Sequence, residues 1–135
     1  MTPQRAELIA RFYEAFLRRD VDEVLALCDE DVEVYKDPNV VEMVSALTPR
    51  GREGVRRYLT GWLESWDLYD PQVAELREAG PDDVVVLVDL HARGRGSQFD
   101  LHEEIADVLT FRGDRVVRLR LHVTRDVALR DAGLD

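Results

Sequence analysis

The sequence predicts an α+β domain in which N-terminal helices cover one face of a single curved antiparallel sheet. Helical spacing of apolar residues dominates the first half of the chain, whereas three consecutive strands with tight turns follow residue 83. One face of those three strands is almost wholly apolar, which is typical of a sheet that packs against helices. The chain has 135 residues, so we expect one domain over residues 1–135.

Three helices are expected in order from the N-terminus. In the first, Thr2 and Pro3 form a helix start, and apolar residues recur at helical spacing up to Leu17. Asp20 can cap a short second helix over residues 21–28. The third helix is predicted over residues 51–66, where one side carries Val55, Tyr58, Leu59, Trp62, Leu63 and Trp66.

The sequence patterns that predict strands are shorter than those that predict helices. A strand is predicted over residues 32–35 and another over residues 72–78, followed by a turn at residues 79–82 and then the three-strand meander. The irregular segment 36–49 is expected to lie across a cavity mouth. A last helical turn is expected to begin near Thr124 and to end at Gly133.

Registers in the meander follow from keeping apolar residues on one face. A two-residue loop at residues 96–97 places Leu90 opposite Glu103 and Val86 opposite Asp107. In the second hairpin, a three-residue loop at residues 112–114 would place Asp107 opposite Leu119, and it keeps Val117, Leu119, Leu121 and Val123 on the inner face.

These registers put two carboxylates, Glu103 and Asp107, on the apolar face. Burying a carboxylate raises its pKa unless a cation or hydrogen-bond donors reach it, and such groups often mark sites. One interpretation is an acid that donates a hydrogen bond to a substrate oxygen. The other is a structural pair, in which Arg120 or a backbone donor satisfies Asp107.

Aromatic side chains could form the walls of such a cavity. Tyr35, Tyr58, Trp62 and Trp66 would offer flat surfaces to a ring-shaped ligand, with tyrosine hydroxyls as orienting donors. Helical spacing alone also explains the two tryptophans as core residues, and this is the interpretation that we favour for them.

The outer face of the sheet carries a different set of residues. His91 is predicted to pair with His102 across the first hairpin, and Glu104 to lie beside Asp89 and His122. Two imidazoles and a carboxylate could bind a transition metal, but the spacing matches no familiar metal motif. Because apolar residues share this face, we favour a homodimer contact and expect no metal there.

Charge and composition restrict the partners. The formal net charge is -10, which disfavours nucleic acid and anionic membranes as partners. The chain shows neither a leader-like apolar segment nor an apolar run of membrane-spanning length, so a cytoplasmic location is expected. Cys28 is the single cysteine and sits among apolar residues, as a small core side chain would.

Several segments along nearly the whole chain together resemble the nuclear transport factor 2-like superfamily, and within it the SnoaL-like polyketide cyclases and the related ketosteroid isomerases. They are residues 10–13, 31–38, 51–55, 94–97, 107–111 and 132–134. The resemblance implies a cone-shaped α+β barrel, usually a homodimer, with a pocket between helices and sheet.

The resemblance also implies site residues. Asp37 before Pro38 matches the proton-shuttling base of the isomerases, although ungapped counting from Phe12 places Lys36 there instead. Asp107 matches the protonated aspartate of their oxyanion site. Phe12 stands in place of the tyrosine that accompanies it, and Tyr13 is one residue away, about 100° around the helix.

Three functions follow as hypotheses. The first is a cofactor-independent isomerase, cyclase or dehydratase acting on a hydrophobic cyclic ketone or polyketide, with Asp37 and Asp107 as its acid–base pair and Tyr13, Tyr35, Tyr58, Trp62 and Glu103 around the substrate. The second is a module that binds a small ligand without chemistry. The third is a dimeric interaction protein with a vestigial pocket.

Overall fold

The computed structural model describes residues 1–35, 49–96, 99–131 and 133. Within them the chain runs α1 (Pro3–Leu17), α2 (Val21–Ala26), β1 (Cys28–Tyr35), α3 (Gly51–Glu64), β2 (Trp66–Ala79), β3 (Asp83–Gly94), β4 (Asp100–Arg112), β5 (Arg115–Thr124) and α4 (Arg125–Asp131). The five strands form one sheet in the order β1-β5-β4-β3-β2. The α+β class is therefore confirmed.

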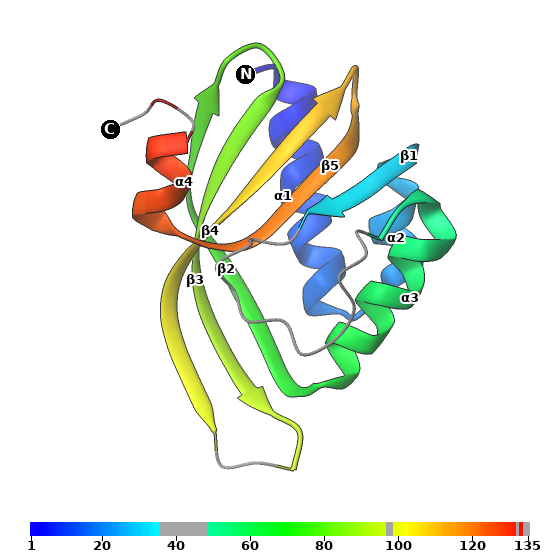
Figure 1. The fold of residues 1–135 in the computed structure, drawn as a ribbon, viewed down its shortest axis with the longest axis vertical. Helices are drawn as coiled ribbons and strands as arrows, with labels where there is room; N and C mark the ends of the chain where they lie inside the picture. Colours follow the sequence, from blue (N-terminus) through cyan, green and yellow to red (C-terminus); the bar gives the residue numbers. More distant parts are fainter. Residues whose placement is uncertain (36–48, 97–98, 132, 134–135) are drawn as a thin grey trace.

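The sheet is mixed and open rather than a closed barrel. β1 runs parallel to β5, whereas the other neighbouring strands are antiparallel. β1 and β2 form the two edges of the sheet in the described part of the chain. Figure 1 shows the strongly curved sheet with α1, α2 and α3 on one side and the short α4 on the other.

Two apolar layers hold the fold together. The main core lies between α1–α3 and the inner face of the sheet, and its fully buried side chains include Phe12, Ile9, Leu59, Leu109 and Leu119. A smaller cluster lies on the outer face, where Ala128 of α4 packs over Val85, Leu87, Ala106 and Val108. The apolar residues that suggested a dimer contact on this face are thus covered by the chain's own last helix.

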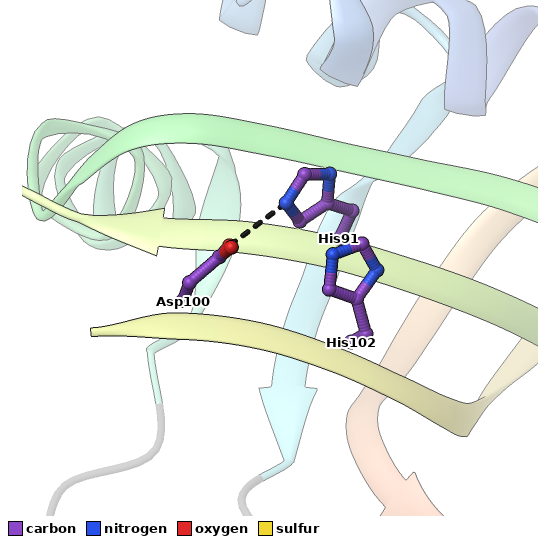
Figure 2. Close-up of side chains that lie close together, drawn as sticks. All are labelled: His91, Asp100 and His102. Carbon is purple, nitrogen blue, oxygen red and sulfur yellow. Dashed lines mark hydrogen bonds and ion pairs between the residues drawn. The ribbon is translucent and has the colours of Figure 1, made fainter. Parts of the chain in front are cut away.

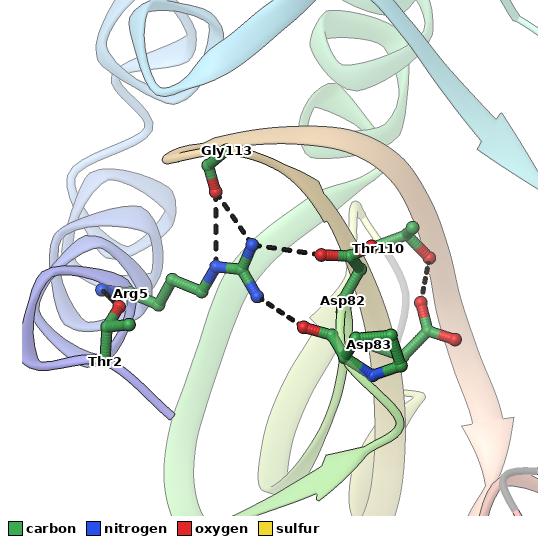
Figure 3. A network of polar contacts seen from close by, with 7 residues as sticks. Thr2, Arg5, Asp82, Asp83, Thr110 and Gly113 are labelled. Carbon is green, nitrogen blue, oxygen red and sulfur yellow. Dashed lines mark hydrogen bonds and ion pairs between the residues drawn. The ribbon is translucent and has the colours of Figure 1, made fainter.

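Helix α1 begins as predicted, and Arg5 links it to the β2–β3 and β4–β5 turns. Thr2 Oγ1 accepts a hydrogen bond from the Arg5 backbone N at 3.2 Å. The Arg5 guanidinium donates to the carbonyls of Gly113 at 3.0 Å and Pro81 at 2.9 Å, and to Asp82 Oδ1 at 3.2 Å (Figure 3). One side chain therefore joins the helix to the β2–β3 and β4–β5 turns.

The first strand starts earlier than predicted. Asp20 caps α2 through a hydrogen bond to the Glu23 backbone N at 3.1 Å, but α2 ends at Ala26 and β1 already begins at Cys28 rather than Val32. The register of β1 against β5 shifts between Cys28 and Glu33. An irregular strand of this kind lacks the strict alternation by which sequence patterns reveal strands.

The second strand is also longer than predicted. Helix α3 ends at Glu64, and β2 runs from Trp66 to Ala79 instead of residues 72–78. Pro71 lies within it, which an edge strand tolerates because the missing N–H need not serve a second neighbour. The predicted turn follows, with Gly80 at φ 74°.

The register of the first hairpin is confirmed. Leu90 pairs with Glu103, Val86 with Asp107 and His91 with His102.

The register of the second hairpin was predicted wrongly. Its loop has two residues, since Arg112 pairs with Arg115, and Leu109 rather than Asp107 lies opposite Leu119. A bulge between Thr110 and Phe111 takes up one extra residue of β5, so that Val116, not Val117, joins the core. A second register shift between Ala106 and Val108 carries Thr124 to a position opposite Ile105. These irregularities keep the inner face apolar despite the shorter loop.

Helix α4 follows β5 and occupies residues Arg125–Asp131, with Gly133 at φ 73° beyond its end. This agrees with the predicted last helical turn. None of the described helices is long and apolar enough to cross a membrane.

Candidate functional site between the helices and the sheet

Asp107 is a buried carboxylic acid in the middle of the inner face of the sheet. Only 4% of it is exposed, and it is the one buried charged residue among those that the structure describes. Tyr13 of α1 donates a hydrogen bond from its hydroxyl to Asp107 Oδ2 at 2.5 Å. A short bond between two buried groups fixes both side chains in one arrangement.

Tyr13 reaches Asp107 because two neighbouring positions of α1 face the core. Phe12 is completely buried and Tyr13 is 5% exposed, and their rings meet edge to face at 5.5 Å. A helix that lies across a curved sheet can bury more than one stripe of side chains. The step of about 100° from Phe12 to Tyr13 therefore does not prevent the hydroxyl from reaching the aspartate.

The surroundings keep both nearby tyrosines protonated. Burial, the charge of Asp107 and the hydrogen bond to it raise the pKa of Tyr13 well above its usual value. Burial and the charge of Asp107 likewise raise the pKa of Tyr69. At neutral pH the site thus contains two neutral hydroxyls within the electrostatic reach of one acid.

Tyr69 is a site residue that the sequence prediction missed. It lies on β2 opposite Ala92 and is 8% exposed. The sequence predicts a helix over residues 51–66 and a strand over residues 72–78, so Tyr69 was assigned to neither. Tyr69 and Pro71 are separated by the charged Asp70, and this period of two is the signal that could have indicated a strand with Tyr69 on its inner face.

Aromatic rings from α1, α3 and the start of β2 surround Tyr69. Its ring centroid lies 6.2 Å from that of Trp62, 6.2 Å from that of Trp66 and 6.3 Å from that of Phe16. Trp62 and Trp66 are half-buried and pack against the main core, and Tyr58 does the same. These half-buried rings connect the surface near α3 with the buried pair at Asp107.

Two other predicted site residues lie elsewhere. Glu103 pairs with Leu90 as predicted, but it is exposed. β5 ends at Thr124, opposite Ile105, so at Glu103 the strand β4 has a paired neighbour on the β3 side alone. Tyr35 is also exposed, and its ring lies 4.8 Å from the guanidinium carbon of Arg118. The inward position of that strand belongs to Val34, so Tyr35 is not a wall of the inner site.

Asp37 and Lys36 lie outside the described residues, as does most of the segment expected to cross the cavity mouth. Surface hollows in the described part of the chain include three: one on the outer face at His91 and His102, one beside α1 and α2, and one beside the Met1 terminus. Asp107 lines none of these three. The inner site is therefore distinct from these three hollows.

A comparison with protein families matches residues 9–119 to the SnoaL-like domain. The chain belongs to the SnoaL-like domain family. Most of the described chain lies within the match, including the larger part of α1 with Tyr13 and all of β4 with Asp107. The comparison with curated proteins gave no significant match.

Solved structures support the same fold. An NTF2-like protein of unknown function from Burkholderia pseudomallei is 21% identical, with a TM-score of 0.79, over 96% of this chain and 97% of that one. TerC, co-crystallised with polyporic acid, is 20% identical with a TM-score of 0.77 over the same shares. A protein with a ketosteroid isomerase-like fold from Catenulispora acidiphila, in complex with trimethylamine, is 16% identical with a TM-score of 0.73, over 100% of this chain and 96% of that one. Similarity at this level shows the fold.

Proposed function

We propose that this protein binds a hydrophobic small molecule between its helices and its sheet and acts on it as a cofactor-independent isomerase, cyclase or dehydratase. The observation that carries the proposal is the buried hydrogen bond between Tyr13 and Asp107. In the resemblance to ketosteroid isomerases, Phe12 stands where their tyrosine–aspartate pair has its tyrosine. Tyr13, at the next helix position, restores such a pair with Asp107. The relatives crystallised with polyporic acid and with trimethylamine support a ligand pocket in this fold.

The chemistry would be proton transfer next to a carbonyl group. A base removes the proton from the carbon beside the carbonyl, the electron pair of that C–H bond moves to the oxygen, and the resulting enolate needs hydrogen-bond donors. On ligand binding, Tyr13 would turn its single hydroxyl hydrogen from Asp107 to the substrate oxygen, and Asp107, protonated at that stage, would supply the second donor. The site is buried, where hydrogen bonds are strong. Asp37 is our candidate for the base, and the same proton would return to another carbon of the substrate.

The substrate class follows from the surroundings of the pair. Tyr69, Trp62 and Trp66 form an aromatic cluster next to Asp107, and flat rings stack favourably on such surfaces. A cyclic ketone or an aromatic polyketide combines a flat apolar body with a carbonyl oxygen. We therefore expect a ligand to enter beside the half-buried tryptophans and to place its oxygen at Tyr13 and Asp107.

A second candidate is a binding protein without catalysis. The observation that favours it is that Tyr13 and Asp107 are 5% and 4% exposed and already satisfy each other. A pair of this kind can serve as a fixed polar anchor for a ligand oxygen without transferring a proton.

Proton exchange distinguishes the candidates without knowledge of the natural substrate. A panel of cyclic ketones, such as 2-tetralone, is incubated with the protein in D₂O, and loss of the proton next to the carbonyl is followed by NMR. An enzyme accelerates exchange above the buffer rate, and we expect Tyr13→Phe and Asp107→Ala to reduce the acceleration about a hundredfold. Tyr35→Phe, an exposed tyrosine, is the matched control and should not change it.

The other outcomes count against catalysis in different ways. Ketones that raise the melting temperature of the protein but exchange at the buffer rate would favour the binding protein. If the panel produced neither stabilisation nor exchange, the interaction hypothesis would take precedence over both.

A further inference from the structure

A second cluster of chemically active side chains lies on the opposite face of the sheet, near the β3–β4 hairpin. His91 and His102 are direct partners across the two strands, and their rings stack with centroids 3.7 Å apart. His91 Nε2 lies 2.8 Å from Asp100 Oδ1 (Figure 2). This cluster is separate from the Tyr13–Asp107 pair, since His91 alternates along β3 with Leu90 and Ala92, which belong to the main core on the other face.

The geometry of the cluster brings three ligand atoms together. One nitrogen of each histidine and one oxygen of Asp100 all lie within 4.8 Å of one another. Bonds of about 2.0–2.1 Å in a tetrahedral site place neighbouring ligand atoms roughly 3.3 Å apart. Rotations of exposed or half-buried side chains are sufficient to close that difference, and the paired strands already hold the three backbones in place.

The chemistry of the three groups selects the kind of ion. Two imidazoles and one carboxylate suit divalent transition metals such as Zn²⁺, Co²⁺ and Ni²⁺ better than Mg²⁺ or Ca²⁺, which prefer oxygen ligands alone.

The surrounding charge favours a cation. The cluster borders a shallow hollow of about 360 Å³ whose lining includes the acidic residues Asp70, Asp89, Glu103 and Glu104. The whole chain has a formal net charge of -10. Negative potential concentrated in a hollow raises the local concentration of cations.

We propose that His91, Asp100 and His102 form a binding site for one divalent transition-metal ion that joins β3 to β4. The three side chains leave at least one coordination position open, which water or an exogenous ligand can fill. Bound metal links two strands beside their hairpin, so it should also stabilise the folded protein. This inference differs from our expectation from sequence that the histidines bind no metal, and it is independent of the proposed function.

The test uses the full chain, freed of metal with a chelator, and titrates it with Zn²⁺ by calorimetry and with Co²⁺ by visible absorption. We expect one ion per chain and a Co²⁺ spectrum with nitrogen and oxygen ligands. His91→Gln, His102→Gln and Asp100→Asn should each weaken Zn²⁺ binding about tenfold or more. Asp89→Asn removes one negative charge, as Asp100→Asn does, but from the lining of the adjoining hollow, and it should change the affinity less than about threefold.

Circular dichroism of each variant without metal checks that the fold is intact, which we expect because Asp100 and His102 are exposed. Absence of saturable binding at one ion per chain would overturn the proposal. So would wild-type affinity in His91→Gln or His102→Gln. Equal weakening by Asp89→Asn and Asp100→Asn would show general attraction of cations instead of ligation, and would overturn it as well.

Discussion

Replacement of Tyr13 by phenylalanine removes one hydroxyl and keeps the ring that packs against Phe12. The variant loses a 2.5 Å hydrogen bond to Asp107 and leaves an acid that is only 4% exposed without that donor. Hydrogen bonds to charged groups contribute about 1.5–3 kcal/mol, and a buried acceptor without its partner costs a similar amount. We therefore expect Tyr13→Phe to lower the free energy of unfolding by about 2–3 kcal/mol at pH 7.

Urea unfolding followed by circular dichroism measures this difference. Tyr35→Phe is the matched control, because Tyr35 is exposed, and it should change the free energy of unfolding by less than about 0.5 kcal/mol. The double variant Tyr13→Phe/Asp107→Leu removes both polar partners and should recover part of the loss, since no buried acceptor remains. A loss below about 0.5 kcal/mol for Tyr13→Phe would refute the reasoning.

Three further predictions concern other parts of the fold. Arg5→Ala removes the guanidinium that joins α1 to two turns and should lower the free energy of unfolding in urea by about 2 kcal/mol. Arg11→Ala is the control: it breaks an exposed ion pair with Glu23 and should lower the free energy of unfolding by less than about 0.5 kcal/mol. Burial raises the pKa of the Cys28 thiol from 9.0 to about 12. A thiol reagent at pH 8 should therefore react with the folded protein about a thousandfold more slowly than with the protein unfolded in urea. Equal rates would show that the thiol of the folded protein is accessible. The pKa of Tyr69 is raised above 10.0 in the folded state. Its contribution to the free energy of unfolding is therefore fully present below pH 10. That contribution is lost as the pH rises above 10, because the tyrosine of the unfolded chain gives up its proton first. Each such tyrosine contributes a slope of up to about 1.4 kcal/mol per pH unit, and Tyr69→Phe should make the loss of stability above pH 10 shallower; an unchanged slope would contradict the assignment.

Local patterns predicted most of the fold. The cap at Thr2 and the periodicity up to Leu17 located α1, and the alternation of β3 and β4 gave the pairing of Val86 with Asp107 correctly. These features depend on neighbours in sequence or on the simple rule that one face of a sheet is apolar. The early start of β1 and the register of β5 could not be predicted, because bulges shift the alternation by one residue without a clear signal.

The candidate site was predicted in part. Asp107 was found on the inner face because the register around it was correct, but its partner Tyr13 depends on how α1 lies across the sheet, which no spacing along the chain reveals. Glu103 shares the face of Asp107 in the alternation yet is exposed, since alternation along β4 does not tell where the neighbouring strand β5 ends. The role of Asp37 stays a prediction.

Binding of 4-nitrophenol tests the central claim most directly, because its oxygen resembles that of an enolate and its neutral and ionised forms absorb at different wavelengths. The measurement is the ¹³C chemical shift of the Asp107 carboxyl group during a titration with this phenol. Our account predicts that the phenol binds beside Tyr13 and that the Asp107 signal moves to the position of a neutral carboxylic acid, while Tyr13→Phe weakens binding. An Asp107 signal that stays unchanged at saturating phenol would show that the buried pair is structural and not a ligand site.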